Sequence, residues 1–286
     1  METAIERNNH TPFGLLVYVT GMEKSIPEKE KLMPYVKGER VLEIGCGSGA
    51  VLELLSRNFP KSAIIGIDNS EQMLSVAKGR EYSTSNVTIL YGDALNKRFE
   101  DESIDTIILS SVLHEVYSYN NYHMEALEKA VSNACEMLVP GGRIIIRDGV
   151  MPTPQVYYLK FRNNETKDSF KKFADDFTPR KISYSLASDS GFPKLGSADA
   201  YEFLSKYFYK ENWAIEVKEQ FGILNLSEYC DILERNGMQI VDAQSYLIDF
   251  LKCKYEKDVS LLEKKDGIYV PANYPDSTAI IIAEKR

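Results

Sequence analysis

The chain has 286 residues, of which 44 % are hydrophobic and 27 % are charged, and its formal net charge at pH 7 is −8. That length suits one α/β domain with a large insertion or two small domains, and the ordinary composition excludes a disordered or fibrous protein. The acidic balance argues against a binder of duplex nucleic acid and favours a small molecule as the ligand.

Cysteine spacing and hydrophobic runs indicate the compartment. The four cysteines, at positions 46, 135, 230 and 253, are too far apart in sequence to form a zinc or redox pair, so we expect no metal site. Residues 1–10 are polar and lack the apolar core of a signal peptide, and no apolar run approaches the ~20 residues of a membrane-spanning helix. We therefore expect a soluble, cytoplasmic protein without a membrane partner.

Short apolar runs alternate with helical patterns along the first half of the chain. Buried strands are predicted at 41–44, 63–67, 87–90, 104–109 and 143–147. Helical patterns lie between them, with Asn69 and Gln72 as a capping-box-like start and the run 140–142, Pro-Gly-Gly, as a stop. Strands that alternate with helices indicate a parallel, doubly wound α/β sheet.

The regular alternation breaks after residue 149. Residues 150–225 are rich in aromatic and charged side chains, with helices expected at 155–175 and 199–209 and a loop at 183–197. A helix at 226–235 and strands at 239–246 and 278–283 then resume the pattern. We interpret 150–225 as a mainly helical insertion that covers the active site, because the last two strands are needed to complete the sheet. The predicted parts are an N-terminal segment (1–37), a cofactor-binding core (38–150), the cover insertion (150–225) and a C-terminal completion of the core sheet (226–286).

The most specific motif is the run VLEIGCGSG at 41–49. A buried strand leads directly into a glycine-rich turn that opens a helix, and glycines allow positive φ and a close approach of a ligand to the backbone. The turn follows the first strand, at the edge where open α/β sheets bind ligands. Gly45, Gly47 and Ala50 also satisfy the dinucleotide fingerprint, so a nicotinamide cofactor remains an alternative.

Further features favour S-adenosylmethionine as the cofactor. Glu43 lies just before the first glycine, and Gly49 extends the motif to GxGxG. A second acidic turn, at 92–94, follows the third strand. Asp68 ends the second strand, where a carboxylate can accept hydrogen bonds from both hydroxyls of a ribose.

These motifs resemble those of the class I S-adenosylmethionine-dependent methyltransferases, well over residues 38–150 and more weakly over the final strands. The resemblance implies a seven-stranded sheet that ends in an antiparallel hairpin, here supplied by 239–246 and 278–283. It also implies that Glu43 organises the methionine end, that Asp93 lies near the adenine amine, and that the segment 12–22 folds over the cofactor. The cofactor-binding residues expected on this basis are Tyr18, Glu43, Gly45, Cys46, Gly47, Gly49, Asp68, Asn69, Met73, Gly92, Asp93, Ala94 and Ser110.

Polar residues that follow the fourth and fifth strands are the candidates for catalysis. His114 is the candidate general base, because it lies at the ligand edge and an imidazole with an unperturbed pKa of about 6.5 suits proton removal near neutrality. Tyr117, Arg147 and Asp148 are expected to orient the acceptor or to share the base role, with Glu115 and Tyr119 as further alternatives.

The predicted function is in-line transfer of a methyl group from S-adenosylmethionine to a small-molecule acceptor. The segment 110–115, SSVLHE, resembles that of small-molecule methyltransferases more than that of DNA methyltransferases. An RNA or protein methyltransferase remains an alternative, as do a nicotinamide-dependent oxidoreductase and an S-adenosylmethionine-binding protein without catalysis.

Overall fold

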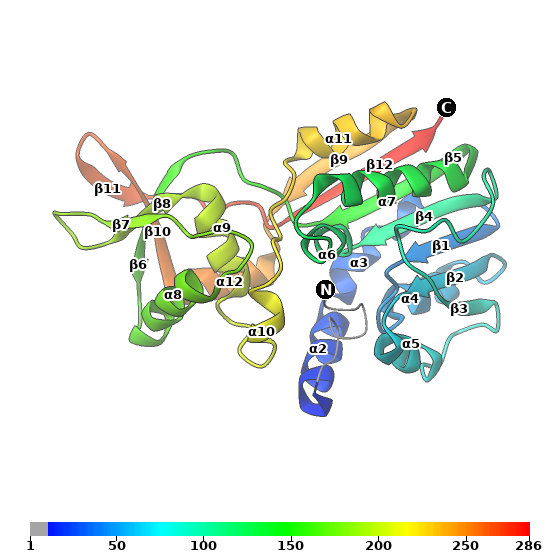
Figure 1. Cartoon of the computed structure of the whole chain (residues 1–286), viewed down its shortest axis with the longest axis horizontal. Helices are drawn as coiled ribbons and strands as arrows, with labels where there is room; N and C mark the ends of the chain where they lie inside the picture. The colour runs from blue at the N-terminus through cyan, green and yellow to red at the C-terminus, as the bar shows by residue number, and fades with distance from the viewer. Residues whose placement is uncertain (1–10) are drawn as a thin grey trace. The chain divides into compact units, whose positions relative to one another are not determined.

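The computed structural model describes residues 11–286, and the chain divides into two compact units. The first unit contains the chain up to Asp148, Ser227–Gln244 and Ile280–Arg286, and the second contains Gly149–Leu226 and Ser245–Ala279. Two separate excursions of the chain therefore build the second unit, as the colours of the ribbon show (Figure 1). The segment 245–279, which the sequence analysis assigned to completion of the core, belongs to this second unit.

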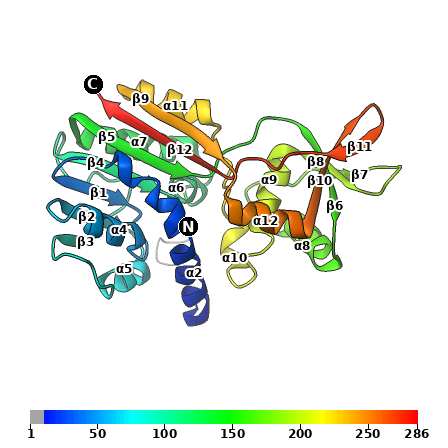
Figure 2. The ribbon, with the colours of Figure 1, turned by 180° about the vertical axis from the view of Figure 1, so that it is seen from behind.

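A seven-stranded sheet forms the centre of the first unit. In spatial order its strands are β3 (Val87–Tyr91), β2 (Ala63–Asp68), β1 (Arg40–Ile44), β4 (Ile104–Ser110), β5 (Leu138–Asp148), β12 (Thr278–Lys285) and β9 (Met238–Tyr246). The first five pair in parallel, whereas the C-terminal strands are antiparallel, as the arrows show (Figure 2). The predicted doubly wound sheet with a C-terminal antiparallel pair is confirmed.

Helices connect these strands and cover the sheet. The N-terminal elements are α2 (Pro12–Lys24), α3 (Ile26–Glu30) and the 3-10 helix η1 (Met33–Tyr35). Between the strands lie α4 (Ala50–Asn58), α5 (Glu71–Lys78), α6 (Leu113–Ser118), α7 (Met124–Met137) and α11 (Leu226–Arg235). Because helices pack on the sheet, its central strands β1 and β4 are buried almost throughout, which explains their continuous apolar sequences.

Strand register brings the expected site residues to one edge of this sheet. Ile44 of β1 lies opposite Ile67 of β2, and Ser110 of β4 lies opposite Arg147 of β5. Because the five strands are parallel, their carboxyl ends and the turns that follow them meet at the same edge.

The second unit contains a sheet that the sequence analysis missed. Its five antiparallel strands, in spatial order, are β11 (Ile268–Pro271), β10 (Val259–Lys265), β6 (Val156–Phe161), β8 (Pro193–Gly196) and β7 (Tyr184–Leu186). Its helices are α8 (Asn164–Asp176), α9 (Ser197–Lys206), α10 (Trp213–Glu216) and α12 (Asp249–Asp258).

Two local expectations for this unit were wrong. The helix expected from residue 155 begins only at Asn164, after a strand, because Asn163 caps it by accepting a hydrogen bond from the Thr166 amide at 2.7 Å. The loop expected at 183–197 contains the antiparallel pair β7 and β8, joined by a turn in which Gly191 has a φ of +69°.

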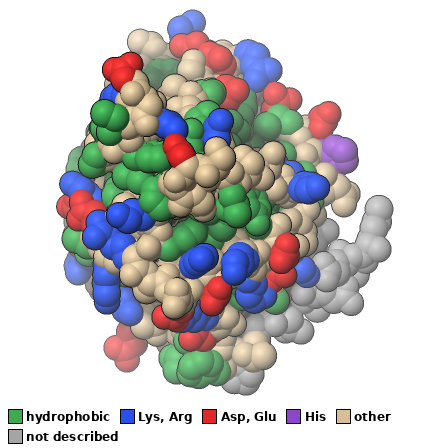
Figure 3. All heavy atoms as spheres, turned by 90° about the vertical axis from the view of Figure 1, so that its left-hand side faces the viewer, with side chains coloured by type: hydrophobic (Ala, Val, Ile, Leu, Met, Phe, Trp, Pro, Cys, Tyr) green, Lys and Arg blue, Asp and Glu red, His purple; other side chains and the backbone are tan. Residues whose placement is uncertain are grey.

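Aromatic side chains of the insertion form the core of the second unit. Tyr157, Phe170, Phe173 and Phe203 are almost fully buried and pack together. We therefore assign these rings to the hydrophobic core of the unit. The face of this unit drawn in Figure 3 also carries exposed hydrophobic side chains among Lys, Arg, Asp and Glu.

Within the described residues, no helix combines the length and the hydropathy needed to cross a bilayer.

Candidate functional site

The glycine loop turns sharply at the end of β1. Gly45 and Gly49 have φ values of +74° and +80°, a region that favours glycine. The amides of Gly45 and Cys46 both donate to the Ile67 carbonyl, at 2.8 and 3.0 Å, which fixes the loop against β2. A Cβ atom at Gly45 would collide with the Val112 side chain, so this position requires glycine for packing as well as for conformation.

Asp68 lies at the end of β2 and binds the glycine loop. Its Oδ2 accepts a hydrogen bond from the Gly47 amide at 2.8 Å, and its Oδ1 accepts one from the Ser70 amide at 2.8 Å. Burial raises the pKa of the Asp68 carboxyl, and these backbone hydrogen bonds partly offset the effect. Each carboxylate oxygen has two lone pairs, so the carboxylate can also accept hydrogen bonds from two hydroxyl groups.

The acidic turn after β3 adjoins Asp68. Gly92 donates its amide to the Asp68 carbonyl at 3.0 Å, and Asn69 Nδ2 donates to Asp93 Oδ2 at 3.2 Å. Ser70, and not Asn69, caps α5 by accepting from the Met73 amide at 3.3 Å. The expected capping box is therefore replaced, since the Asn69 side chain is directed to Asp93.

Four buried polar atoms at this edge have no hydrogen-bond partner in the described part of the chain. They are Glu43 Oε2, Ser48 Oγ, Ser110 Oγ and Arg147 Nε, which come from β1, the glycine loop, β4 and β5. Buried polar atoms in native proteins are almost always hydrogen-bonded, to protein or to water. Their concentration at the carboxyl edge of one sheet, beside a loop with positive φ, fits a polar ligand such as S-adenosylmethionine.

His114 is paired with a buried carboxylate. Its Nδ1 lies 2.6 Å from Asp148 Oδ1, and Asp148 Oδ2 accepts the Leu113 amide at 2.8 Å. Asp148 ends β5 and is almost fully buried, so it fixes the imidazole ring at the start of α6. When a neutral ring donates its Nδ1–H to this carboxylate, Nε2 is the nitrogen that can accept a proton.

A strained turn leads from β4 to His114. Ser111 has a φ of +58°, which is uncommon for a residue with a side chain. Its amide donates to the Arg147 carbonyl at 2.6 Å, and Arg147 Nη1 donates to its Oγ at 2.9 Å. These contacts hold the turn and bring His114, Arg147 and Asp148 together, as expected from the sequence.

The remaining expected residues are placed as follows. Tyr117 lies in α6, with its ring 5.9 Å from that of Tyr122. Tyr18 lies in α2, but its side chain is outside the described part of the structure. Over residues 11–286, no group of His, Cys, Asp and Glu side chains could hold a metal ion.

Lys29 is a site residue that sequence reasoning missed. It lies in α3 and is only 6 % exposed. Glu43 attracts its ammonium group, and Arg147 repels it. Its sequence context, Glu-Lys-Glu-Lys at 28–31, is typical of a solvated helix face, so no local signal could have identified it.

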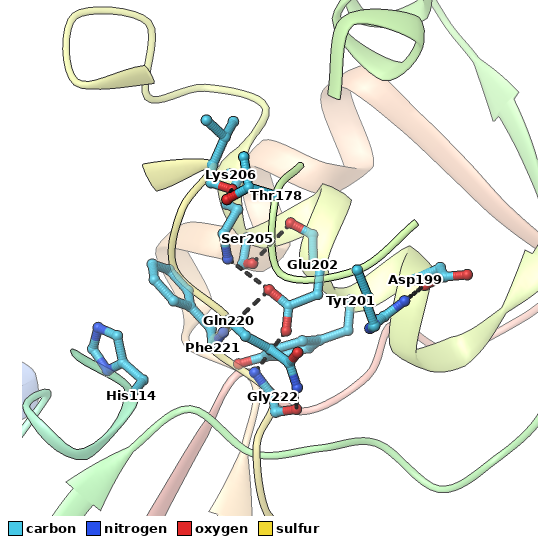
Figure 4. Close-up of polar contacts among 12 residues, drawn as sticks. His114, Thr178, Asp199, Tyr201, Glu202, Ser205, Lys206, Gln220, Phe221 and Gly222 are labelled. Atoms are coloured by element: carbon cyan, nitrogen blue, oxygen red, sulfur yellow. Dashed lines mark hydrogen bonds and ion pairs between the residues drawn. The ribbon is translucent and has the colours of Figure 1, made fainter. Parts of the chain in front are cut away.

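The second unit contains a buried ion pair that the sequence analysis also missed. Lys206 Nζ lies 2.6 Å from Glu202 Oε2 within α9, and the two side chains are 0 % and 1 % exposed. Glu202 also accepts the amides of Phe221 and Gly222, at 3.1 and 2.7 Å (Figure 4). These contacts fasten the segment before α11 to α9.

Comparison with known proteins agrees with this site. The sequence pattern of the Methyltransferase domain family matches residues 36–206, which is more than half of the chain. A demethylmenaquinone methyltransferase of Staphylococcus aureus (strain Newman) is 33 % identical over 131 residues, which are 44 % of this chain and 51 % of the relative. The chain thus spans about half the length of the curated relatives it matches.

Solved structures support the fold. An S-adenosylmethionine-dependent methyltransferase from Mesorhizobium loti superimposes with a TM-score of 0.55 at 14 % identity, covering 91 % of this chain and 97 % of that one. A possible histamine N-methyltransferase from Thermotoga maritima gives 0.51 at 16 % identity, covering 96 % and 100 %. Together with the family match, these findings show that the chain belongs to the class I S-adenosylmethionine-dependent methyltransferase family.

Proposed function

We propose that this enzyme methylates a small molecule whose accepting group loses a proton to His114. The observation that carries the proposal is the 2.6 Å contact between His114 Nδ1 and the buried Asp148 carboxylate. A buried carboxylate on Nδ1 holds the ring in one orientation and stabilises the imidazolium that forms when Nε2 takes up a proton.

The carboxyl edge of the sheet would hold the cofactor. Bound S-adenosylmethionine supplies an activated methyl group, so the protein has mainly to position the acceptor. Asp68 would bind the ribose hydroxyls, and Asp93 would lie at the adenine. Glu43 would face the methionine end, where its unpartnered Oε2 supports this role.

Acceptor binding would involve the residues around His114. Arg147 is buried beside Ser111, and its Nε is one of the unpartnered atoms, so it can donate a hydrogen bond to an acceptor or cofactor oxygen. Tyr117, in the same helix as His114, would add a hydroxyl group to this side of the site.

Two observations favour a small molecule over RNA or protein as the acceptor. The Staphylococcus aureus relative described above acts on demethylmenaquinone, by its name. The net charge of −8 also counts against an RNA acceptor, which would require a basic surface.

The four cysteines are free in the structure, which is consistent with the proposed cytoplasmic location.

The test begins with a screen for the acceptor, in which transfer of labelled methyl from S-adenosylmethionine into a metabolite extract is measured. With the acceptor identified, His114→Ala and His114→Gln should lower kcat by about 10²–10⁴, because general-base catalysis contributes that much. The affinity for S-adenosylhomocysteine, measured by calorimetry, should stay unchanged.

His123→Ala is the matched control, because this exposed histidine precedes α7 and its side chain is 68 % exposed. It should leave both quantities unchanged. A fall in kcat of less than a few-fold in both His114 variants would remove His114 from the chemistry.

A further inference from the structure

Lys29 is a buried cation that forms no direct ion pair within the described part of the chain. The residue is 6 % exposed, and Glu43 attracts its ammonium group without a hydrogen bond to it. Burial of a charge is unfavourable unless the charge is paired and hydrogen-bonded. A buried cation of this kind fits an anionic group of a ligand.

Four charged groups from separate elements shift the pKa of Lys29. They are Glu43 of β1, Arg147 of β5, Glu23 of α2 and Arg80, which follows α5. Arg80 and Glu23 form an ion pair with each other, and Arg80 Nε donates to the Ser48 carbonyl at 3.0 Å. Glu23 is therefore paired with Arg80, and Arg80 repels Lys29 because both side chains are cations.

Glu43 and Arg147 also keep unpartnered atoms. Glu43 is 2 % exposed with Oε2 unpaired, and Arg147 is 6 % exposed with Nε unpaired, among the described residues. Burial lowers the pKa of Lys29 to about 8, against the attraction of Glu43, and burial raises the pKa of Glu43 well above its usual value. Both shifts show that the two charged forms are incompletely compensated by the chain itself.

Such a pair of opposite buried charges matches a zwitterion. The amino-acid end of S-adenosylmethionine carries an α-carboxylate and an α-ammonium group on one carbon atom. We infer that Lys29 binds the α-carboxylate of the cofactor while Glu43 faces the α-ammonium group. The inference rests on the proposed cofactor site and assigns to the N-terminal segment a binding residue for the amino-acid end.

Binding calorimetry with three adenosine ligands tests this assignment without any turnover. S-adenosylhomocysteine carries both charged groups, its decarboxylated analogue 5′-(3-aminopropylthio)-5′-deoxyadenosine lacks only the carboxylate, and 5′-methylthioadenosine lacks both. Lys29→Met should weaken binding of S-adenosylhomocysteine by roughly tenfold or more, the range for a hydrogen bond to a charged group. It should change the affinity for the other two ligands by less than about twofold.

Three further variants complete the design. Lys31→Met makes the same chemical change at an exposed position two residues away and should leave all three affinities unchanged. Lys29→Arg keeps the charge and should retain the preference for the carboxylate. Glu43→Gln should weaken both ligands that carry the ammonium group and spare 5′-methylthioadenosine.

The outcomes separate this inference from the proposed cofactor site. An equal loss of affinity for all three ligands in Lys29→Met would assign Lys29 a structural role and overturn the inference. Undiminished binding of S-adenosylhomocysteine by the folded Lys29→Met protein would overturn it as well. Failure of the wild-type protein to bind any of the three would reject the cofactor site, and the inference with it.

Discussion

Burial of Lys29 makes the stability of the first unit depend on pH. Lys29 is protonated in the unfolded chain up to its ordinary pKa of 10.5, whereas its pKa in the folded protein is about 8. Between these values the unfolded chain binds more protons than the folded chain, so this residue makes stability rise with pH in that window. At pH 7 the ammonium form therefore destabilises the ligand-free fold.

The lowered pKa of Lys29 predicts that the affinity for S-adenosylhomocysteine depends on pH. The carboxylate of S-adenosylhomocysteine requires the protonated form of Lys29, so its affinity should fall as pH rises through about 8. One linked proton limits the fall to about tenfold per pH unit. Calorimetric titrations between pH 6.5 and 9.5 measure this, and Lys29→Met should flatten the profile.

The melting temperature of Lys29→Met provides a second test. In Lys29→Met, the melting temperature without ligand at pH 7 should equal or exceed that of the wild type, because a buried and uncompensated ammonium is removed. A marked drop in melting temperature, or an affinity profile that keeps its slope above pH 8 in the variant, would contradict this account.

At the scale of elements, one buried carboxylate of α9 binds the segment that leads to α11. Glu202 binds Lys206 in its own helix and two amides of the segment that leads to α11. Lys206 Nζ also lies 3.4 Å from the centre of the Phe221 ring, so the cation is enclosed by an acid and an aromatic face. Every charge in this cluster is thus paired within the unit.

Breaking that pair should be costly. Glu202→Gln leaves the Lys206 ammonium group, which is 0 % exposed, without its counter-ion, and removal of one partner of a buried pair destabilises by about 3–5 kcal/mol. The double variant Glu202→Gln, Lys206→Met should lose less of the free energy of unfolding, because no charge remains buried. Urea unfolding measures both free energies.

The exposed pair Lys172 and Asp176 in α8 provides the control, with side chains 57 % and 36 % exposed. Lys172→Met should change the free energy of unfolding by no more than about 1 kcal/mol. A single Glu202→Gln variant as stable as its double counterpart would show that the buried charge is not the cause.

The sequence predicted the first unit well because its signals are local. Continuous apolar strands such as β4 and the glycine loop after β1 need no knowledge of distant residues. The second sheet was missed because β6 pairs with β10, whose residues lie far along the chain, so neither strand can be assigned from its own neighbourhood. The burial of Lys29 was not predicted for the same reason, since it depends on tertiary packing.

Across the whole molecule, the expected cofactor residues belong to one unit. Gly47, Asp68, Asp93 and Ser110 all lie in the first unit, and so does His114, which is proposed to contact the acceptor. A ligand that binds only the folded state stabilises what it contacts, by about 2.7 kcal/mol at a concentration of 100 times its Kd. Cofactor and acceptor are proposed to contact different turns of this unit, so each should stabilise the turns that it contacts.

Hydrogen exchange can resolve these two contributions. S-adenosylhomocysteine alone should slow exchange in the glycine loop and in the turns at 68–70 and 92–95, because these backbone segments surround the proposed site. Addition of the acceptor should extend protection to α6, since His114 and Tyr117 of this helix are proposed to bind the acceptor. Asp68→Ala should abolish the first effect at the same ligand concentration, because it removes an acceptor for two ribose hydroxyls, whereas Asp101→Ala, at an exposed carboxylate, should not. Protection of 149–226 by S-adenosylhomocysteine alone, equal to that of the glycine loop, would contradict the assignment of the cofactor to the first unit.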